Sequence, residues 1–252
     1  MMSSHLDIRV TSFDLEQRAF KPHRCFEWAQ QGHEALSPPM ATGPEITWVY
    51  GRQRARWHAP DSAAKTVRVQ TWLADVAGAF ATREFRIHDA DDGRLLFERQ
   101  TVSVALDTAT LRPTQADLSP LKSLVTGSKG DLAVGAVCAV DGEPSLEQFR
   151  FERQVEADDL DRHAHVNNAS YIRWTTDALA RHAWEAHPGR LAAHRFGELE
   201  IRYLYPLKMR ETVVLSGRSA GDAAWRIDMS LRDGRAVATV SLRVHEVVGR
   251  KG

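Results

Sequence analysis

The sequence predicts an α+β protein made of two similar halves, each a long helix wrapped by a curved antiparallel β-sheet. An internal repeat indicates the two halves. The triplet Asp-Leu-Glu at residues 14–16 recurs as Asp-Leu-Asp at residues 159–161, and each triplet is followed by a tryptophan, Trp28 or Trp174. Two Asp-Gly pairs recur in the same order, each between runs of strand-like residues. The repeat gives each half a lead-in strand, one helix and several strands.

The two Asp-Gly pairs, Asp92-Gly93 and Asp233-Gly234, predict tight hairpins, since glycine accepts the positive φ that such turns need. After each pair comes an alternating run, from Thr101 to Leu106 in the first half and from Val237 to Val244 in the second. Alternation of this kind is typical of a strand with one buried face. We therefore expect a hairpin in each half.

A helix is predicted in the second half, from about Val166 onward. Apolar or small side chains recur there at helical spacing, at Ala169, Ile172, Thr176, Leu179 and Ala183. Asn167 or Asn168 is the expected N-cap, because a short carboxamide accepts from the exposed amides of a first helical turn.

Length and composition fit two domains. The chain of 252 residues allows two units of about 110 residues, each large enough for a core. Between them the composition shifts toward Pro, Gly, Ser and Thr, as in a connection between domains. We predict a first domain over residues 1–115, a linker over residues 116–147 with a short helix near residues 118–125, and a second domain over residues 148–252.

Composition also excludes several classes of protein. Charged residues make up 26% of the chain, hydrophobic residues make up 43%, and the formal net charge is zero. Steering toward nucleic acid or an anionic membrane is therefore not expected. The longest apolar run, residues 132–140, is too short for a membrane span, and the first residues lack an apolar signal core. With two distant cysteines and no disulfide framework, a cytoplasmic protein is expected.

The segment just before the predicted helix holds the densest group of chemically active side chains. It contains a carboxylate (Asp161), two imidazoles (His163 and His165) and two carboxamides (Asn167 and Asn168). The first amides of a helix have no intrahelical partner and carry partial positive charge, so they polarise a carbonyl placed there. Such a group of side chains is suited to acyl transfer. The structural alternative is that these residues cap the helix and fix the preceding loop to it.

The segment Asp-Leu-Asp-x-x-x-His-Val-Asn-Asn-x-x-Tyr-Ile-x-Trp, at residues 159–174, resembles the signature of the acyl-ACP thioesterases, members of the hotdog-fold thioesterase superfamily. Runs at residues 46–57, 67–72 and 91–113 are similar to that family's first domain, in the same order. The resemblance covers most of residues 8–245. It implies two tandem hotdog domains and a thioester hydrolase of fatty acid biosynthesis.

Carried over residue by residue, the family's catalytic Asp falls on Asp161 and its His on His165. The family's Asn falls on His163, which is a departure. The family's acidic residue or neighbouring Cys on a downstream strand falls near Leu204 and Tyr205, and neither of these can act as the acid.

A nearby carboxylate, Glu200, would complete the site only if it lies on the right face of its strand. The first half keeps an acid at Glu16 but lacks the His-Val-Asn-Asn run, so one site is expected, in the second half. The resemblance implies that the first half supplies the acyl-binding tunnel. Either the lining of that tunnel or an ordinary core would account for the aromatic residues Phe20, Phe26, Trp28, Trp48, Trp57, Trp72 and Phe80.

Thioester hydrolysis needs a base that activates water and a site for the oxyanion. His165 is the candidate base, and Asp161 would orient the imidazole, activate water directly or attack the carbonyl. The backbone amides expected to hold the oxyanion are those of Val166, Asn167 and Asn168. His163 is a further candidate for positioning the thioester or water. Neither a metal nor a cofactor is expected.

The expected substrate carries phosphopantetheine, on an acyl carrier protein or on coenzyme A. Arg52, Arg54 and Arg56 alternate along one strand and would offer a basic docking face, unless nearby acids balance them.

Two alternative functions remain open. One is a hotdog hydrolase of aromatic or β-keto (polyketide) thioesters, which the departures at His163 and Leu204 favour, and the other is a non-catalytic acyl or carrier-protein binder. The chain is expected to be a monomer, with its two halves as a pseudo-dimer, or a homodimer.

Overall fold

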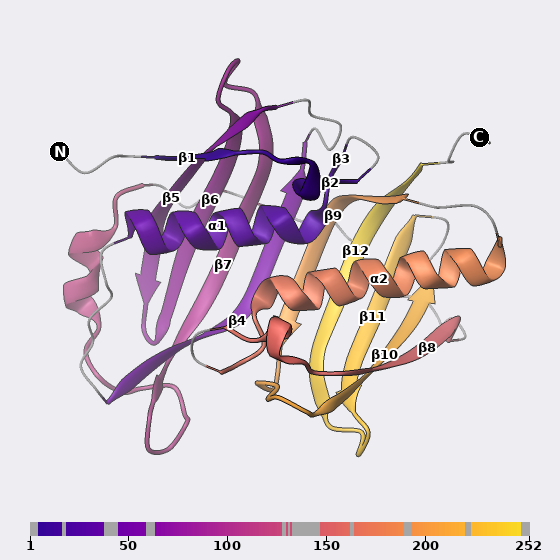
Figure 1. The fold of residues 1–252 in the computed structure, drawn as a ribbon. Helices are drawn as coiled ribbons and strands as arrows, with labels where there is room; N and C mark the ends of the chain where they lie inside the picture. Colours follow the sequence, from indigo (N-terminus) through magenta and orange to yellow (C-terminus); the bar gives the residue numbers. More distant parts are fainter. Residues whose placement is uncertain are drawn as a thin grey trace.

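The computed structural model describes residues 5–16, 19–37, 45–58, 64–127, 130, 132, 147–161, 164–188, 193–219 and 223–247. Within them, ten strands form a single antiparallel sheet in the order β1-β5-β6-β7-β4-β9-β12-β11-β10-β8, and β2 pairs with β3 apart from it. Helices α1 and α2 lie on one side of the large sheet (Figure 1). The α+β class with one long helix for each half is therefore confirmed.

The elements of the two halves follow the same order. The first half contains β1 (Leu6–Arg9), the 3-10 helix η1 (Ser12–Asp14), β2 (Leu15–Glu16), β3 (Ala19–Phe20), α1 (Pro22–Leu36), β4 (Ile46–Trp57), β5 (Thr66–Ala77), β6 (Phe80–Asp89) and β7 (Leu95–Asp107). The second contains β8 (Phe149–Gln154), the 3-10 helix η4 (Ala157–Asp159), α2 (Asn168–Ala186), β9 (Ala193–Tyr203), β10 (Thr212–Ser219), β11 (Ala224–Leu231) and β12 (Ala236–Val247). Each helix thus follows a strand and a 3-10 turn, and four long strands follow each helix.

The two halves share one sheet because β4 pairs with β9. Their register runs from Arg52 opposite Arg202 to Arg56 opposite Glu198. The main core continues across this seam, and both helix tryptophans, Trp28 and Trp174, are buried in it. Burial of two indole side chains under the helices is a large apolar contribution, about 2–3 kcal/mol for each ring.

The predicted hairpins are present. Gly93 lies between β6 and β7 with a φ of 75°, and Gly234 lies between β11 and β12 with a φ of 87°. A positive φ of this size is strained for a residue with a Cβ atom, so glycine is required at both turns. The signal in the sequence was local, which is why it placed both hairpins correctly.

The connection between the halves begins after β7 and contains the 3-10 helix η2 (Ser119–Leu124), close to the short helix expected near residues 118–125. Leu118 and Leu121 pack on Leu73, Val76, Ala81 and Ala105, a second cluster separate from the main core. The domain boundaries at residues 115 and 148 stay predictions. No helix in the described ranges is long and apolar enough to cross a membrane.

Candidate functional site

Asp161 and His165 lie at the two ends of a tight turn that leads into α2. The backbone N–H of Asp161 donates to the carbonyl of His165 at 2.8 Å, and the N–H of His165 donates to Oδ1 of Asp161 at 3.2 Å. Ala164 closes the turn in the left-handed region, with a φ of 58°. Residues 162 and 163 lie outside the described part of the chain, so the structure places the Asp161 and His165 candidates together but says nothing of His163.

The end of this turn is fixed to α2 by Asn167, which is the N-cap. Its Oδ1 accepts from the N–H of Ala169 at 2.9 Å, as expected for one of the two asparagines. The sequence also predicted that the backbone amides of Val166, Asn167 and Asn168 would bind the oxyanion. The structure leaves fewer of these amides available. The N–H of Val166 donates to the carbonyl of Leu207 at 3.3 Å, and the N–H of Asn167 donates to the carbonyl of Asp159 at 2.8 Å.

Two of the three expected amide donors are therefore already engaged by carbonyls of the fold. The third expected donor is the backbone N–H of Asn168. This residue also carries a carboxamide side chain, and it is only 7% exposed. Its Nδ2 has no hydrogen-bond partner among the described residues. A buried carboxamide donor without a partner is costly unless a ligand completes it, so Asn168 is the better candidate for contact with substrate.

Asp159 holds the start of the turn against α2, a role that was not predicted from the sequence. It is fully buried and accepts from Arg173 at 2.5 Å and from the indole Nε1 of Trp174 at 3.0 Å. Its backbone carbonyl accepts from the hydroxyl of Ser170 at 3.2 Å. The first half has a counterpart in Asp14. The recurrence of Asp-Leu in the two halves was the available signal.

Glu200 does not belong to this site. Its neighbours Leu199 and Ile201 face the core beneath the helices, so the side chain of Glu200 points to the opposite face of β9. There it accepts from Arg54 at 2.7 Å and from Arg202 at 2.8 Å. The carboxylate that would complete the catalytic set is therefore not supplied by Glu200.

The ion pair between Glu200 and Arg54 also bears on the predicted docking face of Arg52, Arg54 and Arg56. Arg54 is bound by Glu200, and Arg56 forms ion pairs with Glu198 at 3.0 Å and Glu98 at 3.5 Å. Acids on neighbouring strands thus balance Arg54 and Arg56, two of the three arginines predicted to form a docking face. Leu204, at the position of the family's acid, is 59% exposed.

Three tyrosines link the turn to the first half. The ring of Tyr171 on α2 lies 5.3 Å from that of Tyr203 on β9, which lies 6.5 Å from that of Tyr50 on β4. Burial is the main cause that raises the pKa of Tyr50, and the carboxylates of Glu34 and Asp161 raise it further, while Arg99 lowers it. The ring contacts therefore connect α2, the helix that follows the turn, with β4 of the first half.

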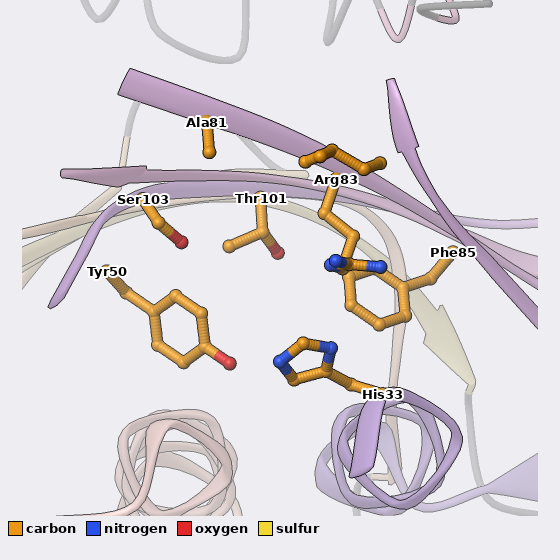
Figure 2. A pocket seen from close by; sticks show the side chains of 8 residues that line it. His33, Tyr50, Ala81, Arg83, Phe85, Thr101 and Ser103 are labelled. Atoms are coloured by element: carbon orange, nitrogen blue, oxygen red, sulfur yellow. The ribbon is translucent and has the colours of Figure 1, made fainter. Parts of the chain in front are cut away.

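Tyr50 also lines a cavity between α1 and the first-half strands. Figure 2 shows its hydroxyl, His33 of α1 and the guanidinium of Arg83 converging there. The complete lining is His33, Tyr50, Leu73, Ala81, Arg83, Phe85, Thr101 and Ser103. None of the aromatic residues proposed for an acyl tunnel is among them, and Phe20, Phe26, Trp28 and Trp57 belong to the main core. The available signal was the run Arg99, Thr101, Ser103, which places polar residues at the inward-facing positions of a strand.

Comparisons with known proteins agree with this architecture. Residues 142–209 match the model of the acyl-ACP thioesterase C-terminal domain. A dodecanoyl-[acyl-carrier-protein] hydrolase of Umbellularia californica is 25% identical over 154 residues, 57% of this chain and 38% of that protein. Its counterpart from Cinnamomum camphora is 24% identical over 152 residues, with the same coverage of both chains. The chain thus spans 38% of the length of these curated relatives.

Solved structures extend the likeness to the whole fold. The 12:0-ACP thioesterase from Umbellularia californica superposes with a TM-score of 0.79 at 14% identity, over 96% of this chain and 97% of that one. A putative oleoyl thioesterase from Lactobacillus plantarum gives 0.76 at 18% identity, over 98% and 97%. The fold is therefore that of a tandem hotdog protein. The matched domain and the motif at residues 159–174 lie in the second half, and there the chain is similar to the acyl-ACP thioesterases.

Proposed function

We propose that this protein hydrolyses acyl thioesters carried on a phosphopantetheine arm, with Asp161 and His165 as its catalytic pair. The observation that carries the proposal is the turn in which these two residues meet at the N-terminus of α2. It stands in a chain whose motif and fold are those of acyl-ACP thioesterases. The curated relatives act on an acyl carrier protein ester by name, which favours a carrier protein over coenzyme A.

The reaction needs few groups, because a thiolate is a good leaving group. The imidazole of His165 takes a proton from water while the water oxygen attacks the carbonyl carbon of the thioester. The carbonyl electrons move onto oxygen, where the side chain of Asn168 donates a hydrogen bond. The carbon–sulfur bond then breaks, and the imidazolium returns its proton to the leaving sulfur. The products are a free acid and a thiol.

Asp161 can take one of two roles in this reaction, and its location next to His165 is compatible with both. It orients the imidazole and stabilises its protonated form, or its carboxylate attacks the carbonyl to form a mixed anhydride that water then opens. Incubation in ¹⁸O-labelled water under single-turnover conditions tests for the second role. Label in Asp161 establishes the anhydride route, with attack of water on the Asp161 carbonyl of the anhydride. Attack of water on the acyl carbonyl puts the label in the product acid in either route.

The test of the function is thiol release with analysis of the free acid, over a panel of acyl-CoA and acyl-carrier-protein thioesters. Asp161→Asn and His165→Ala are each expected to lower kcat/KM by about a hundredfold or more. Asp158→Asn and His187→Ala, exposed residues at the two ends of the same region, serve as matched controls. If no thioester is cleaved by the wild-type protein while it binds acyl chains or carrier protein, the chain is a binder and not a hydrolase.

A further inference from the structure

Two arginines are buried beneath α1 without an acidic partner among the residues that the structure describes. The side chain of Arg99 is 0% exposed, and none of its three guanidinium nitrogens has a hydrogen-bond partner among the described residues. Arg83 is also buried and has one such partner, the hydroxyl of Ser37, at 2.8 Å. Burial lowers the pKa of each to about 10, so both remain charged at neutral pH. Two positive charges are thus held out of water.

The groups around these arginines are short of acceptors. Thr101 and Gln53 oppose each other across β7 and β4, and both Oγ1 of Thr101 and Nε2 of Gln53 lack partners within the described ranges. The hydroxyl of Tyr50 donates to Gln30 of α1 at 2.9 Å. Glu34, an acid on the same helix, accepts from Gln30 at 3.0 Å. Within the described ranges, no carboxylate is among the charges that act on Arg83 or Arg99.

Part of this charge is compensated within the fold. The guanidinium of Arg99 lies 4.1 Å from the ring centroid of Phe85 and 5.2 Å from that of Phe26, and Arg83 lies at the negative end of the α1 dipole through its bond to Ser37. Neither contact supplies a hydrogen-bond acceptor to Arg99. A buried guanidinium without acceptors destabilises a fold, so a purely structural role does not account for the pair.

The cavity that Arg83 lines is adjacent to the candidate catalytic turn. Tyr50 lines the cavity (Figure 2), and its ring is connected through that of Tyr203 to Tyr171 in the first turns of α2. An acyl group whose carbonyl lies at the turn would therefore extend past Tyr50 toward Arg83. The end of an alkyl chain would supply no acceptor to Arg83 or Thr101.

We propose that this cavity binds the carboxylate of an acidic acyl group, so that the preferred substrate is a monothioester of a dicarboxylic acid. The inference rests on the proposed thioesterase function for its substrate, although the anion site itself does not depend on turnover. A carboxylate has about four acceptor positions and matches the planar fork of a guanidinium. It therefore supplies acceptors to Arg83 and Thr101, which line the cavity, and its charge offsets that of Arg99, which lies against the lining residue Phe85.

The selectivity test compares hexanoyl with adipoyl thioesters on the same carrier, which differ by the terminal carboxylate. The wild-type protein is expected to prefer the adipoyl ester by about a hundredfold in kcat/KM, the size expected for a charge-assisted hydrogen-bonded contact. Arg83→Met and Arg99→Met are expected to abolish most of that preference. Arg86→Met, on the opposite face of the same strand as Arg83, is the matched control and is expected to keep it. Equal or greater activity on the hexanoyl ester, unaffected by Arg83→Met, would overturn the proposal.

Binding without turnover separates this inference from the proposed function. Calorimetry of the wild-type protein is expected to detect adipate and not hexanoate, and Arg83→Met is expected to lose the adipate signal. Adipate binding in a protein that cleaves no thioester would reject the hydrolase and keep the anion site. Thioester cleavage without adipate binding would reject the anion site and keep the hydrolase.

Thermal unfolding tests the structural explanation. Since Arg99→Met removes an unsatisfied buried charge, it is expected to raise the melting temperature without ligand, and adipate is expected to raise that of the wild-type protein and not of the variant. A melting temperature that falls in both methionine variants, with selectivity unchanged, would assign the two arginines to the fold.

Discussion

Asp14 and Asp159 occupy the same position in the two halves of the molecule. Each ends a 3-10 helix, is buried, and accepts from the backbone amide three residues earlier, at 2.6 Å from Thr11 and 3.0 Å from Glu156. Each also binds an arginine of the helix that follows, Arg24 or Arg173, at 2.5 Å. The repeat has therefore kept its helix anchor in both halves, whereas the His-Val-Asn-Asn run occurs in the second half alone.

Removal of the second anchor should loosen the candidate catalytic turn. Asp159→Asn leaves Arg173 without its carboxylate and Arg153 with Asp177 alone, and it is expected to lower the free energy of unfolding by about 2 kcal/mol. The loss is smaller than for a fully buried pair, because the arginine side chains are 33% and 35% exposed. Urea titration checks this, with Asp158→Asn of the same 3-10 helix as control. Equal stability of the two variants would contradict the anchor role.

The adjacent asparagines should separate into a structural and a functional residue. Asn167→Ala removes the N-cap and is expected to lower the free energy of unfolding by about 1 kcal/mol. Asn168→Ala removes the unpartnered Nδ2 and is expected to lower kcat by about a hundredfold, with a smaller change in KM. Steady-state kinetics and urea titration of both variants measure the two effects. The assignment of Asn168 fails if its substitution affects stability and leaves kcat as in the wild type.

His23 should make the fold sensitive to mild acid. Burial, followed by the charges of Arg173 and Arg24, lowers the pKa of His23 to about 4. The unfolded chain binds a proton near pH 6.5, so the folded state loses stability as pH falls from there toward the folded pKa. Between pH 7 and pH 5 the loss is about 2 kcal/mol. The measurement is urea unfolding at both pH values for the wild type and for His23→Gln. Equal pH dependence in the two proteins would contradict the prediction.

Glu200 should behave as a structural residue in spite of its place in the sequence. Glu200→Gln removes the charge that Arg54 and Arg202 share and is expected to lower the free energy of unfolding by about 1–2 kcal/mol. Its kcat/KM is expected to stay within about threefold of the wild type, because the side chain lies on the face of β9 away from the turn. A loss of activity as large as that of Asp161→Asn, in a folded variant, would return Glu200 to the site.

Local signals in the sequence were sufficient for much of the fold. The Asp-Gly hairpins at Gly93 and Gly234, the capping by Asn167 and the repeat of Asp14 in Asp159 are each written in a few neighbouring residues. The register in which β4 pairs with β9 cannot be predicted from neighbouring residues in this way. It depends on contacts between residues about 150 positions apart, and it decides that Glu200 meets Arg54 and not the catalytic turn.

The parts of the site that escaped sequence analysis are non-local in the same way. The amides of Val166 and Asn167 were expected to be free, but carbonyls of Leu207 and Asp159 occupy them. The cavity at Arg83 and Thr101 required knowledge of which strands lie beneath α1. Composition left open whether the aromatic residues of the first half line a tunnel or form the core, and the structure places Phe26 and Trp57 in the core.

The most direct test of the central claim is chemical rescue of His165→Ala during thioester hydrolysis. His165 is exposed, so added imidazole can enter the space left by its side chain. His165→Ala is expected to lose about a hundredfold or more in kcat, and imidazole is expected to restore part of it as the fraction of neutral imidazole rises with pH. Undiminished thioester hydrolysis by His165→Ala without imidazole would exclude His165 as the general base.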